Sequence, residues 1–295
     1  MQILGVWDLT GHTGPVYALA CDEERKLLYS AGADGIVALW SCQSGKEALA
    51  VARTPTAIYA MRYVPQTQML FVGQTSGLIY ILKPYEKKLL SRIQAHKAAV
   101  MGISSHPTDL EGWSSGKDGF FLYWDTVSGQ PTASVEVTET GLRSFVPIPG
   151  RRLFACAGRD GSAYIISRDD RAILKTLPVE NQPLFSLAVS SDEKTLWIGA
   201  QSGRIYAWSL EDWTLRASWE AHSRAVNALA LDPTGKWLAS AGRDKQIHLW
   251  EARSGKRILS LPGHLRSVNA LQWIDREVLA SAGDDGLIKV WHLEA

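Results

Sequence analysis

The sequence predicts an all-β protein made of seven four-stranded antiparallel sheets, and three observations carry this prediction. The first is a ladder of acidic or hydroxyl residues 42 positions apart, with a last step of 41. Each of these residues is called a rung: Asp34, Ser76, Asp118, Asp160, Ser202, Asp244 and Asp285. The second is a large apolar residue six positions after each rung: Trp40, Leu82, Trp124, Ile166, Trp208, Trp250 and Trp291. The third is that turn residues recur in phase with the ladder. A fixed period of this length indicates one supersecondary unit repeated along the chain.

The repeated unit is clearest at residues 221–262. Four short runs, beginning near Val226, Trp237, Ile247 and Arg257, are separated by turns rich in Gly, Pro, Asp and Ser. Short runs bounded by such turns are typical of antiparallel strands. No helical periodicity of comparable length occurs, so each unit is expected to be one small sheet.

Two kinds of turn recur at the repeat spacing. Prolines are expected between the first and second strands, at Pro65, Pro107, Pro149 and Pro233. Ser-Gly dipeptides are expected between the third and fourth strands, at Ser44-Gly45-Lys46, Ser128-Gly129-Gln130 and Ser254-Gly255-Lys256. The Ser-Gly-Lys triplets lack the upstream glycine of a phosphate-binding loop, so a nucleotide site is not expected there.

A sheet of about 42 residues cannot bury both faces alone, so the sheets must stack, and stacking around an axis closes the structure. The sequence therefore predicts a seven-bladed β-propeller in a single domain, 1–295, with repeat units at about 11–52, 53–94, 95–136, 137–178, 179–220, 221–262 and 263–295. The last unit stops after its third strand. Residues 1–10, with a strand at Ile3–Leu9, are expected to complete it and close the ring.

Composition places the chain among ordinary globular proteins. It has 295 residues, of which 46% are hydrophobic and 21% charged. A net charge of +1 argues against a general binder of nucleic acid or membrane surfaces. Cys21, Cys42 and Cys156 have no metal-ligand spacing and are interpreted as reduced thiols of an intracellular protein. With no signal peptide and no apolar run of 18 residues, a cytoplasmic location is expected.

Four units carry a further signature around the ladder. A small residue and a histidine open them, at Gly11-His12, Ala95-His96, Ala221-His222 and Gly263-His264. A tryptophan dipeptide closes their third strands, at Trp40-Ser41, Trp124-Asp125, Trp250-Glu251 and Trp291-His292. With these motifs the sequence resembles the WD-repeat (WD40) β-propeller family over essentially its whole length, although only one dipeptide is literally Trp-Asp.

The same four units contain Ser, His and Asp together, which would also suit a catalytic triad. The sets are His12/Ser30/Asp34/Trp40, His96/Ser114/Asp118/Trp124, His222/Ser240/Asp244/Trp250 and His264/Ser281/Asp285/Trp291. The resemblance implies that they are structural networks, in which Trp and Ser, and His and Asp, hydrogen-bond within each blade. Four copies around a ring suit a scaffold, whereas an enzyme needs one site. We therefore expect bracing rather than catalysis.

The other three units depart from this pattern. Thr54, Thr138 and Glu180 occupy the histidine position, and Ser76 and Ser202 replace the aspartate in two of the units. Leu82 and Ile166 replace the tryptophan in two of them. These blades are expected to depend on apolar packing instead.

The candidate partner-binding residues follow from the resemblance, because partners of WD-repeat proteins most often use the narrower face of the disc. That face should present the residue before each rung and those flanking the start of each first strand. The candidates are Tyr17, Tyr59, Lys117, Arg143, Arg159, Phe185, Arg243, Asn227, Asn269 and Asp284. Arginine and aromatic residues are usual anchors of protein interfaces. The hypothesis is a face that binds an acidic or carboxylate-bearing peptide. The alternative, that these residues are solvated turn charges, stays open.

The expected function is therefore a non-enzymatic scaffold that presents a rigid face to partner proteins or peptides and is a monomer on its own. No cofactor and no metal site are expected, since four of the seven histidines belong to the networks. Neither nucleic acid nor membrane is expected as a partner. Two alternatives stay open: a propeller that binds a small ligand or sugar, and an enzyme that uses the central mouth. The enzyme would need convergent acids or histidines, which the candidate face does not offer.

Overall fold

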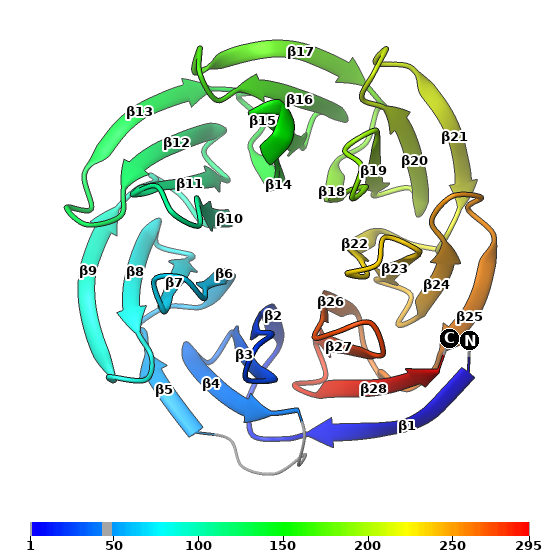
Figure 1. Ribbon diagram of the computed structural model, residues 1–295, viewed down its shortest axis with the longest axis horizontal. Coiled ribbons are helices and arrows are strands. Elements are labelled where there is room, and N and C mark those ends of the chain that lie inside the picture. Colours follow the sequence, from blue (N-terminus) through cyan, green and yellow to red (C-terminus); the bar gives the residue numbers. More distant parts are fainter. Residues whose placement is uncertain (1, 43–48, 295) are drawn as a thin grey trace.

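The protein is a ring of seven four-stranded antiparallel sheets around a central axis (Figure 1). The structure is a computed structural model that describes residues 2–42 and 49–294. In each blade one strand lies next to the axis and the fourth lies on the outer circumference. The predicted all-β, seven-bladed architecture is confirmed.

Blades 1 to 6 each use four consecutive strands, paired in chain order. Blade 1 comprises β2 (Val16–Asp22), β3 (Leu27–Gly32), β4 (Ile36–Ser41) and β5 (Leu49–Arg53). Blade 2 comprises β6 (Ile58–Val64), β7 (Met69–Gln74), β8 (Leu78–Lys83) and β9 (Lys88–Gln94). Blade 3 comprises β10 (Val100–Ser105), β11 (Glu111–Gly116), β12 (Phe120–Asp125) and β13 (Pro131–Glu136).

The second half of the ring repeats this arrangement. Blade 4 comprises β14 (Leu142–Ile148), β15 (Leu153–Gly158), β16 (Ser162–Ser167) and β17 (Ala172–Pro178), with the 3-10 turn η1 (Pro149–Arg151) after β14. Blade 5 comprises β18 (Leu184–Val189), β19 (Thr195–Ala200), β20 (Arg204–Ser209) and β21 (Leu215–Glu220). Blade 6 comprises β22 (Val226–Leu231), β23 (Trp237–Gly242), β24 (Ile247–Glu251) and β25 (Arg257–Leu261).

Blade 7 is built from both ends of the chain. It contains β26 (Val268–Trp273), β27 (Val278–Gly283), β28 (Ile288–Glu294) and, as its outer strand, β1 (Gln2–Leu9). β1 pairs antiparallel with β28, so that Val6 lies opposite Trp291 and Leu9 opposite Ile288. The ring is thus closed by the N-terminal strand, as the sequence predicts.

The core lies between neighbouring blades and not within any one of them. One aliphatic residue near the start of each first strand is completely buried, at the repeat spacing: Val16, Ile58, Val100, Leu142, Leu184, Val226 and Val268. Val16 of blade 1, for example, shares an apolar cluster with Ile288 of blade 7. Each sheet therefore covers the face of the next, which is why a single unit would not be stable alone.

The predicted turns lie where the period places them. Pro65, Pro107 and Pro233 fall between first and second strands, and Pro149 begins η1. Gly129 and Gly255 adopt positive φ between third and fourth strands, a conformation that glycine allows without steric cost. The triplet Ser44-Gly45-Lys46 lies outside the described residues. Within the described part of the chain, no helix is long and apolar enough to cross a membrane.

Candidate functional site

Blade 6 shows the full hydrogen-bonded network. His222 Nδ1 donates to Asp244 Oδ1 at 2.9 Å, and the Ser240 hydroxyl donates to His222 Nε2 at 2.8 Å. Trp250 Nε1 in turn donates to Ser240 Oγ at 2.8 Å. Burial opposes ionisation of Asp244, but hydrogen bonds from His222 and from the backbone N–H groups of Ser223 and Gln246 outweigh it and lower the pKa of Asp244 to about 2.

Blades 1 and 7 repeat this network. In blade 1, His12 lies 2.9 Å from Asp34 and 2.8 Å from Ser30, which accepts from Trp40 Nε1 at 2.7 Å. In blade 7, His264 lies 3.1 Å from Asp285 and 2.8 Å from Ser281, which accepts from Trp291 Nε1 at 2.9 Å. The four network serines (Ser30, Ser114, Ser240 and Ser281) have no exposed surface. A substrate has no access to these hydroxyls, so the sets act as braces.

Blade 3 departs from the expected network at its tryptophan. His96 contacts Asp118 at 3.0 Å and Ser114 at 2.8 Å, but Trp124 Nε1 has no hydrogen-bond partner among the described residues. The residue opposite Trp124 is Gly112, where the other three braced blades have a leucine, at Leu28, Leu238 and Leu279. A Cβ on Gly112 would lie 2.3 Å from the indole ring. The missing side chain lets the ring of Trp124 lie over this position, away from Ser114.

Blades 4 and 5 carry polar contacts of their own. Thr138 Oγ1 donates to Asp160 at 2.8 Å, and the Tyr164 hydroxyl donates to the same carboxylate. In blade 5 the roles are exchanged: Ser202 and Tyr206 donate to Glu180 Oε2 at 2.7 Å and 2.9 Å. The expectation that these blades depend on apolar packing instead is therefore wrong.

A tyrosine is the sequence signal that was missed in the departing blades. The fourth residue after the rung is Tyr80, Tyr164 or Tyr206 in blades 2, 4 and 5. In the braced blades the same position holds Ala38, Leu122, His248 and Lys289. Where the histidine is absent, a tyrosine from the third strand lies in the same region, and in two blades its hydroxyl binds the acid.

The ten candidate partner-binding residues all line one cavity of about 690 Å³ on the axis. The cavity opens at the end of the ring where the first strands begin. Two rows of the repeat build it. The upper row is the residue before each rung, including Lys117, Arg159 and Arg243, and the deeper row is the second residue of each first strand, including Arg143.

The cations of this cavity have no anionic partner. Lys117, Arg143, Arg159 and Arg243, which we call the mouth cations, form no ion pair within the described residues. The Arg143 guanidinium lies 4.2 Å from the centre of the Phe185 ring. Burial, followed by the positive charge of Arg159 and of Arg243, lowers the pKa of Arg143 below its usual value. The arginines are therefore close enough to repel one another.

The opposite side of the cavity is less basic. Asp284 accepts a hydrogen bond of 2.7 Å from Asn269, and the rings of Tyr17 and Tyr59 meet edge to face at 4.8 Å. Burial is the main reason that the pKa of Tyr17 is raised, with the nearby Asp284 adding to it. The one acid of the candidate set thus lies beside the tyrosines and is hydrogen-bonded to an asparagine.

An apolar ring, not singled out in the sequence, forms the floor of the cavity. It contains one residue per blade, each 42 positions from the next: Leu19, Met61, Ile103, Phe145, Leu187, Leu229 and Leu271. The signal was present, because these residues lie two positions after the deeper row of the candidates. We call this ring the collar.

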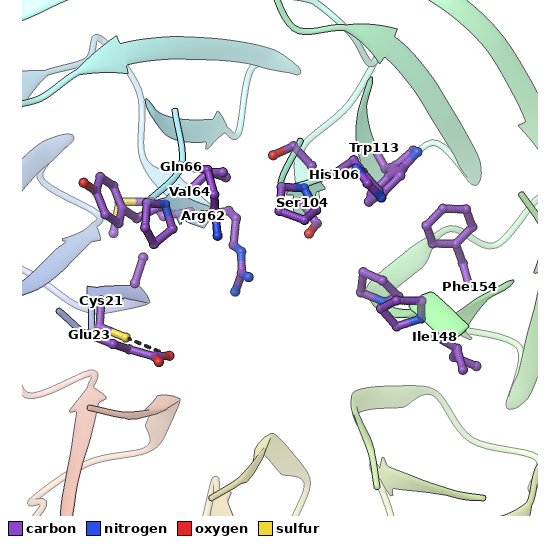
Figure 2. A pocket seen from close by; sticks show the side chains of 18 of the residues that line it. Cys21, Glu23, Arg62, Val64, Gln66, Ser104, His106, Trp113, Ile148 and Phe154 are labelled. Carbon is purple, nitrogen blue, oxygen red and sulfur yellow. Dashed lines mark hydrogen bonds between the residues drawn. The ribbon is translucent and has the colours of Figure 1, made fainter. Parts of the chain in front are cut away.

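A second cavity, of about 430 Å³, lies at the opposite end of the axis (Figure 2). It is lined by the ends of the first strands of blades 1 to 4, where Arg62 points into the open space between Cys21 and His106. Leu19 and Met61 of the collar line both cavities. The two other arginines that line it are neutralised, since Arg168 pairs with Asp109 and Glu111 and Arg152 pairs with Asp169.

The thiols offer no reactive group. Burial raises the pKa of Cys21 and of Cys42 to about 12, and it also raises that of Cys156. A thiol with a raised pKa is a poor nucleophile and a poor metal ligand. Within residues 2–42 and 49–294, no group of three or more His, Cys, Asp or Glu side chains is placed to hold a metal ion.

These features define a seven-bladed propeller in which polar side chains brace the blades and four cations without an ion pair among the described residues line a cavity at one end of the axis. The family model "WD domain, G-beta repeat" matches residues 4–41, 213–251 and 255–292. The chain is a WD40-repeat β-propeller. Propellers of this family are typically protein-interaction scaffolds and are generally non-catalytic.

Known proteins resemble the chain at moderate distance. It is 32% identical over 166 residues to "Transducin beta-like protein 3" of Mus musculus, which covers 56% of this chain and 21% of that protein. It is 24% identical over 204 residues to "Eukaryotic translation initiation factor 3 subunit I" of Pyricularia oryzae, covering 64% of this chain and 59% of that one. The chain thus spans about a fifth and about three fifths of these two relatives.

A solved structure supports the fold over the full length of the ring. The crystal structure of the WD40 β-propeller domain of Doa1 superposes with a TM-score of 0.88 and covers 99% of this chain and 98% of that domain. The sequence identity is 18%, so this likeness supports the fold alone.

Proposed function

We propose that the protein is a non-enzymatic interaction scaffold that binds an acidic segment of a partner protein. The binding site is the axial cavity lined by the mouth cations, which we call the axial mouth. The observation that carries this proposal is the set of four mouth cations, which converge on one cavity without an acid to neutralise them. A carboxylate from a partner would supply the missing charge. The chain itself is proposed to be monomeric and cytoplasmic.

The surroundings of Arg143 favour the binding of an anion. Arg143 is half-buried against Phe185 and repelled by two other arginines, so part of its desolvation is already present before any ligand arrives. Charge-assisted hydrogen bonds to a carboxylate are about twice as strong as neutral ones. Because the side chains project from strand ends and tight turns of a closed ring, little reordering is needed on binding.

The relatives support an assembly role without naming a partner. The Pyricularia oryzae relative is described as a subunit of a translation initiation factor, which is a component of a larger complex. A chain with four cations around one axial cavity is suited to a similar task of holding other proteins.

Charge reversal in the upper row of the cavity, which we call the rim, tests the proposal. The triple variant Lys117→Glu, Arg159→Glu and Arg243→Glu should lose the proteins that the wild type captures from extracts of its native host. A matched control reverses three exposed charges of outer strands, Lys88→Glu, Lys175→Glu and Arg257→Glu, and should retain them. Unchanged capture by the rim variant would reject the axial mouth as the binding site.

A further inference from the structure

We propose that the axial mouth receives a phosphomonoester, namely a phosphorylated side chain of the partner. This inference rests on the proposed function and names the chemistry of its ligand. The feature that carries it is the number, direction and depth of the unpaired cations around one cavity.

The charge balance of the mouth exceeds what one carboxylate neutralises. Four cations face one acid, and that acid, Asp284, is already hydrogen-bonded to Asn269. The mouth therefore has an excess of three positive charges. A carboxylate carries one negative charge, whereas a phosphomonoester carries about −1.5 to −2 at neutral pH.

The donors also approach from several directions. Lys117 belongs to blade 3, Arg143 and Arg159 to blade 4 and Arg243 to blade 6. A carboxylate has two oxygens in one plane, which a single guanidinium can satisfy. A phosphoryl group presents three oxygens in a tetrahedral arrangement, so it can accept from converging groups on different sides at once. The arrangement therefore fits a phosphoryl group better than a flat carboxylate.

The depth of the cations sets the shape of the ligand. Lys117, Arg159 and Arg243 lie at the rim, while Arg143 lies one row deeper, directly above the collar. The apolar collar and the Phe185 ring surround Arg143 at the bottom of the cavity, and apolar surroundings strengthen charge interactions. A single phosphorylated side chain entering along the axis reaches both rows. A nucleic-acid backbone would need a surface track, and the chain's overall charge of +1 does not supply one.

Short synthetic peptides test this chemistry directly. Three fluorescein-labelled peptides with one flexible Gly-rich sequence would carry phosphoserine, glutamate or serine at the central position. We expect the phosphoserine peptide to bind at least tenfold more tightly than the glutamate peptide, by fluorescence anisotropy at low ionic strength. The serine peptide should not bind measurably.

Matched variants assign the site. Arg143→Met keeps the apolar stem and removes the charge, and should weaken phosphoserine binding at least tenfold. Arg62→Met removes an arginine from the opposite cavity and should leave binding unchanged. If Arg143→Met does not fold, judged by circular dichroism, the exposed pair Arg159→Gln and Arg243→Gln serves the same purpose.

Each remaining outcome decides against the proposal or refines its source. Equal affinity for the phosphoserine and glutamate peptides, or no binding of either, would overturn it, as would equal losses in the Arg143 and Arg62 variants. Inorganic phosphate that binds as tightly as the peptide would overturn the assignment to a phosphorylated side chain and point to a free phosphate. Binding of an oligonucleotide that outcompetes the peptide would overturn it in favour of nucleic acid.

Phosphatase treatment separates this inference from the proposed function. Partner capture from host extracts should be lost after the extract is treated with phosphatase. Capture that survives phosphatase but is lost with the triple rim variant would retain the scaffold proposal and reject the phosphomonoester.

Discussion

Blades 1, 3, 6 and 7 are held by a histidine network, whereas blades 2, 4 and 5 are not, yet all seven have the same strand order and the same buried aliphatic residue at the start of the first strand. In blade 6 three hydrogen bonds connect Trp250, Ser240, His222 and Asp244 in series. In blade 5 a single carboxylate, Glu180, accepts from two hydroxyls. The backbone is therefore specified by apolar packing between blades, and the polar network determines how strongly each blade is locked.

The largest effect is expected from blade 7, which has a complete network but takes its outer strand from the other end of the chain. Removing residues 1–10 exposes β28 and removes Leu9, whose burial alone is worth about 1.5–3 kcal/mol. We expect the melting temperature to fall by about 10 °C or more. Adding residues 1–10 as a separate peptide should restore part of it. An unchanged melting curve would show that the network suffices without β1.

The next effect compares the rung residues of two blades, Asp244 in blade 6 and Ser202 in blade 5. Asp244→Ala removes bonds to His222, to Ser223 N–H and to Gln246 N–H and leaves a buried imidazole unpaired, which should cost about 3 kcal/mol. The equivalent change in blade 5, Ser202→Ala, removes one bond to Glu180 and should cost about 1 kcal/mol. Urea denaturation of both variants measures the difference, and equal losses would contradict the comparison.

A pH dependence should separate blade 6 from the rest. His248 stacks on His222 at 4.8 Å, and burial, with the nearby His222, lowers the pKa of His248 to about 4. The unfolded chain takes up this proton near pH 6.5 while the folded chain does not, so stability falls as pH decreases from about 6.5 to about 4.

His248→Leu introduces the residue that blade 3 has at this position, Leu122. It should reduce the loss of unfolding free energy between about pH 6.5 and pH 4 by about 2–3 kcal/mol. The pKa of His264 is also lowered by burial, but His264 is present in both proteins, so the difference isolates His248. Urea titrations at pH 7, 5.5 and 4 provide the measurement. Parallel pH profiles would rule out His248 as the cause.

A smaller effect compares two tryptophans within the braced blades. Trp250→Phe removes an indole N–H that binds Ser240, whereas Trp124→Phe removes one that binds nothing in the described structure. Because both changes reduce volume alike, we expect Trp250→Phe to be the more destabilising by about 1 kcal/mol. Gly112→Ala should destabilise blade 3, since its Cβ would meet the Trp124 ring. Equal costs for the two tryptophans would refute the difference in their networks.

The smallest effect belongs to the tyrosines of the departing blades. Tyr164→Phe removes a donor to Asp160 and should cost about 0.5–1.5 kcal/mol. In blade 2 the rung residue Ser76 accepts from Thr56 and, within the described residues, not from Tyr80, so Tyr80→Phe should be nearly neutral. Thermal unfolding distinguishes them. A greater loss from Tyr80→Phe would mean that ring packing, and not the hydroxyl, decides the effect.

Much of the fold follows from the period alone, because a 42-residue spacing places equivalent residues in equivalent positions whatever their chemistry. The resemblance to WD-repeat propellers predicted Lys117, Arg143 and Arg243 on one face, and in the structure they line one cavity. It could not place the ring of Trp124, since that depends on the residue opposite it, and the pairing with Gly112 is a matter of register. The tyrosine contacts of Asp160 and Glu180 were missed although Tyr164 and Tyr206 share one repeat position, because the acid that each contacts lies at a different position of its unit.

Recognition of the family from sequence follows the networks more closely than it follows the fold. The three segments that the family model matches, 4–41, 213–251 and 255–292, each contain one complete set from histidine to tryptophan. Blade 3 lies outside them, although its sequence carries His96, Ser114, Asp118 and Trp124 at the same spacing. All seven blades keep the same strand order, whether or not the family model matches them.

The pairing of β1 with β28 makes the two ends of the chain neighbours on the outer circumference (Figure 1). The ring is therefore close to a cyclic molecule, in which the place where the chain is cut is a matter of convenience. A short linker could join the ends, and new ends could be opened in a turn between a third and a fourth strand, such as the one after β12, which does not line the axial cavity. Such circular permutants would keep the axial mouth intact while moving the point of attachment for a surface, a label or a second protein to any chosen blade.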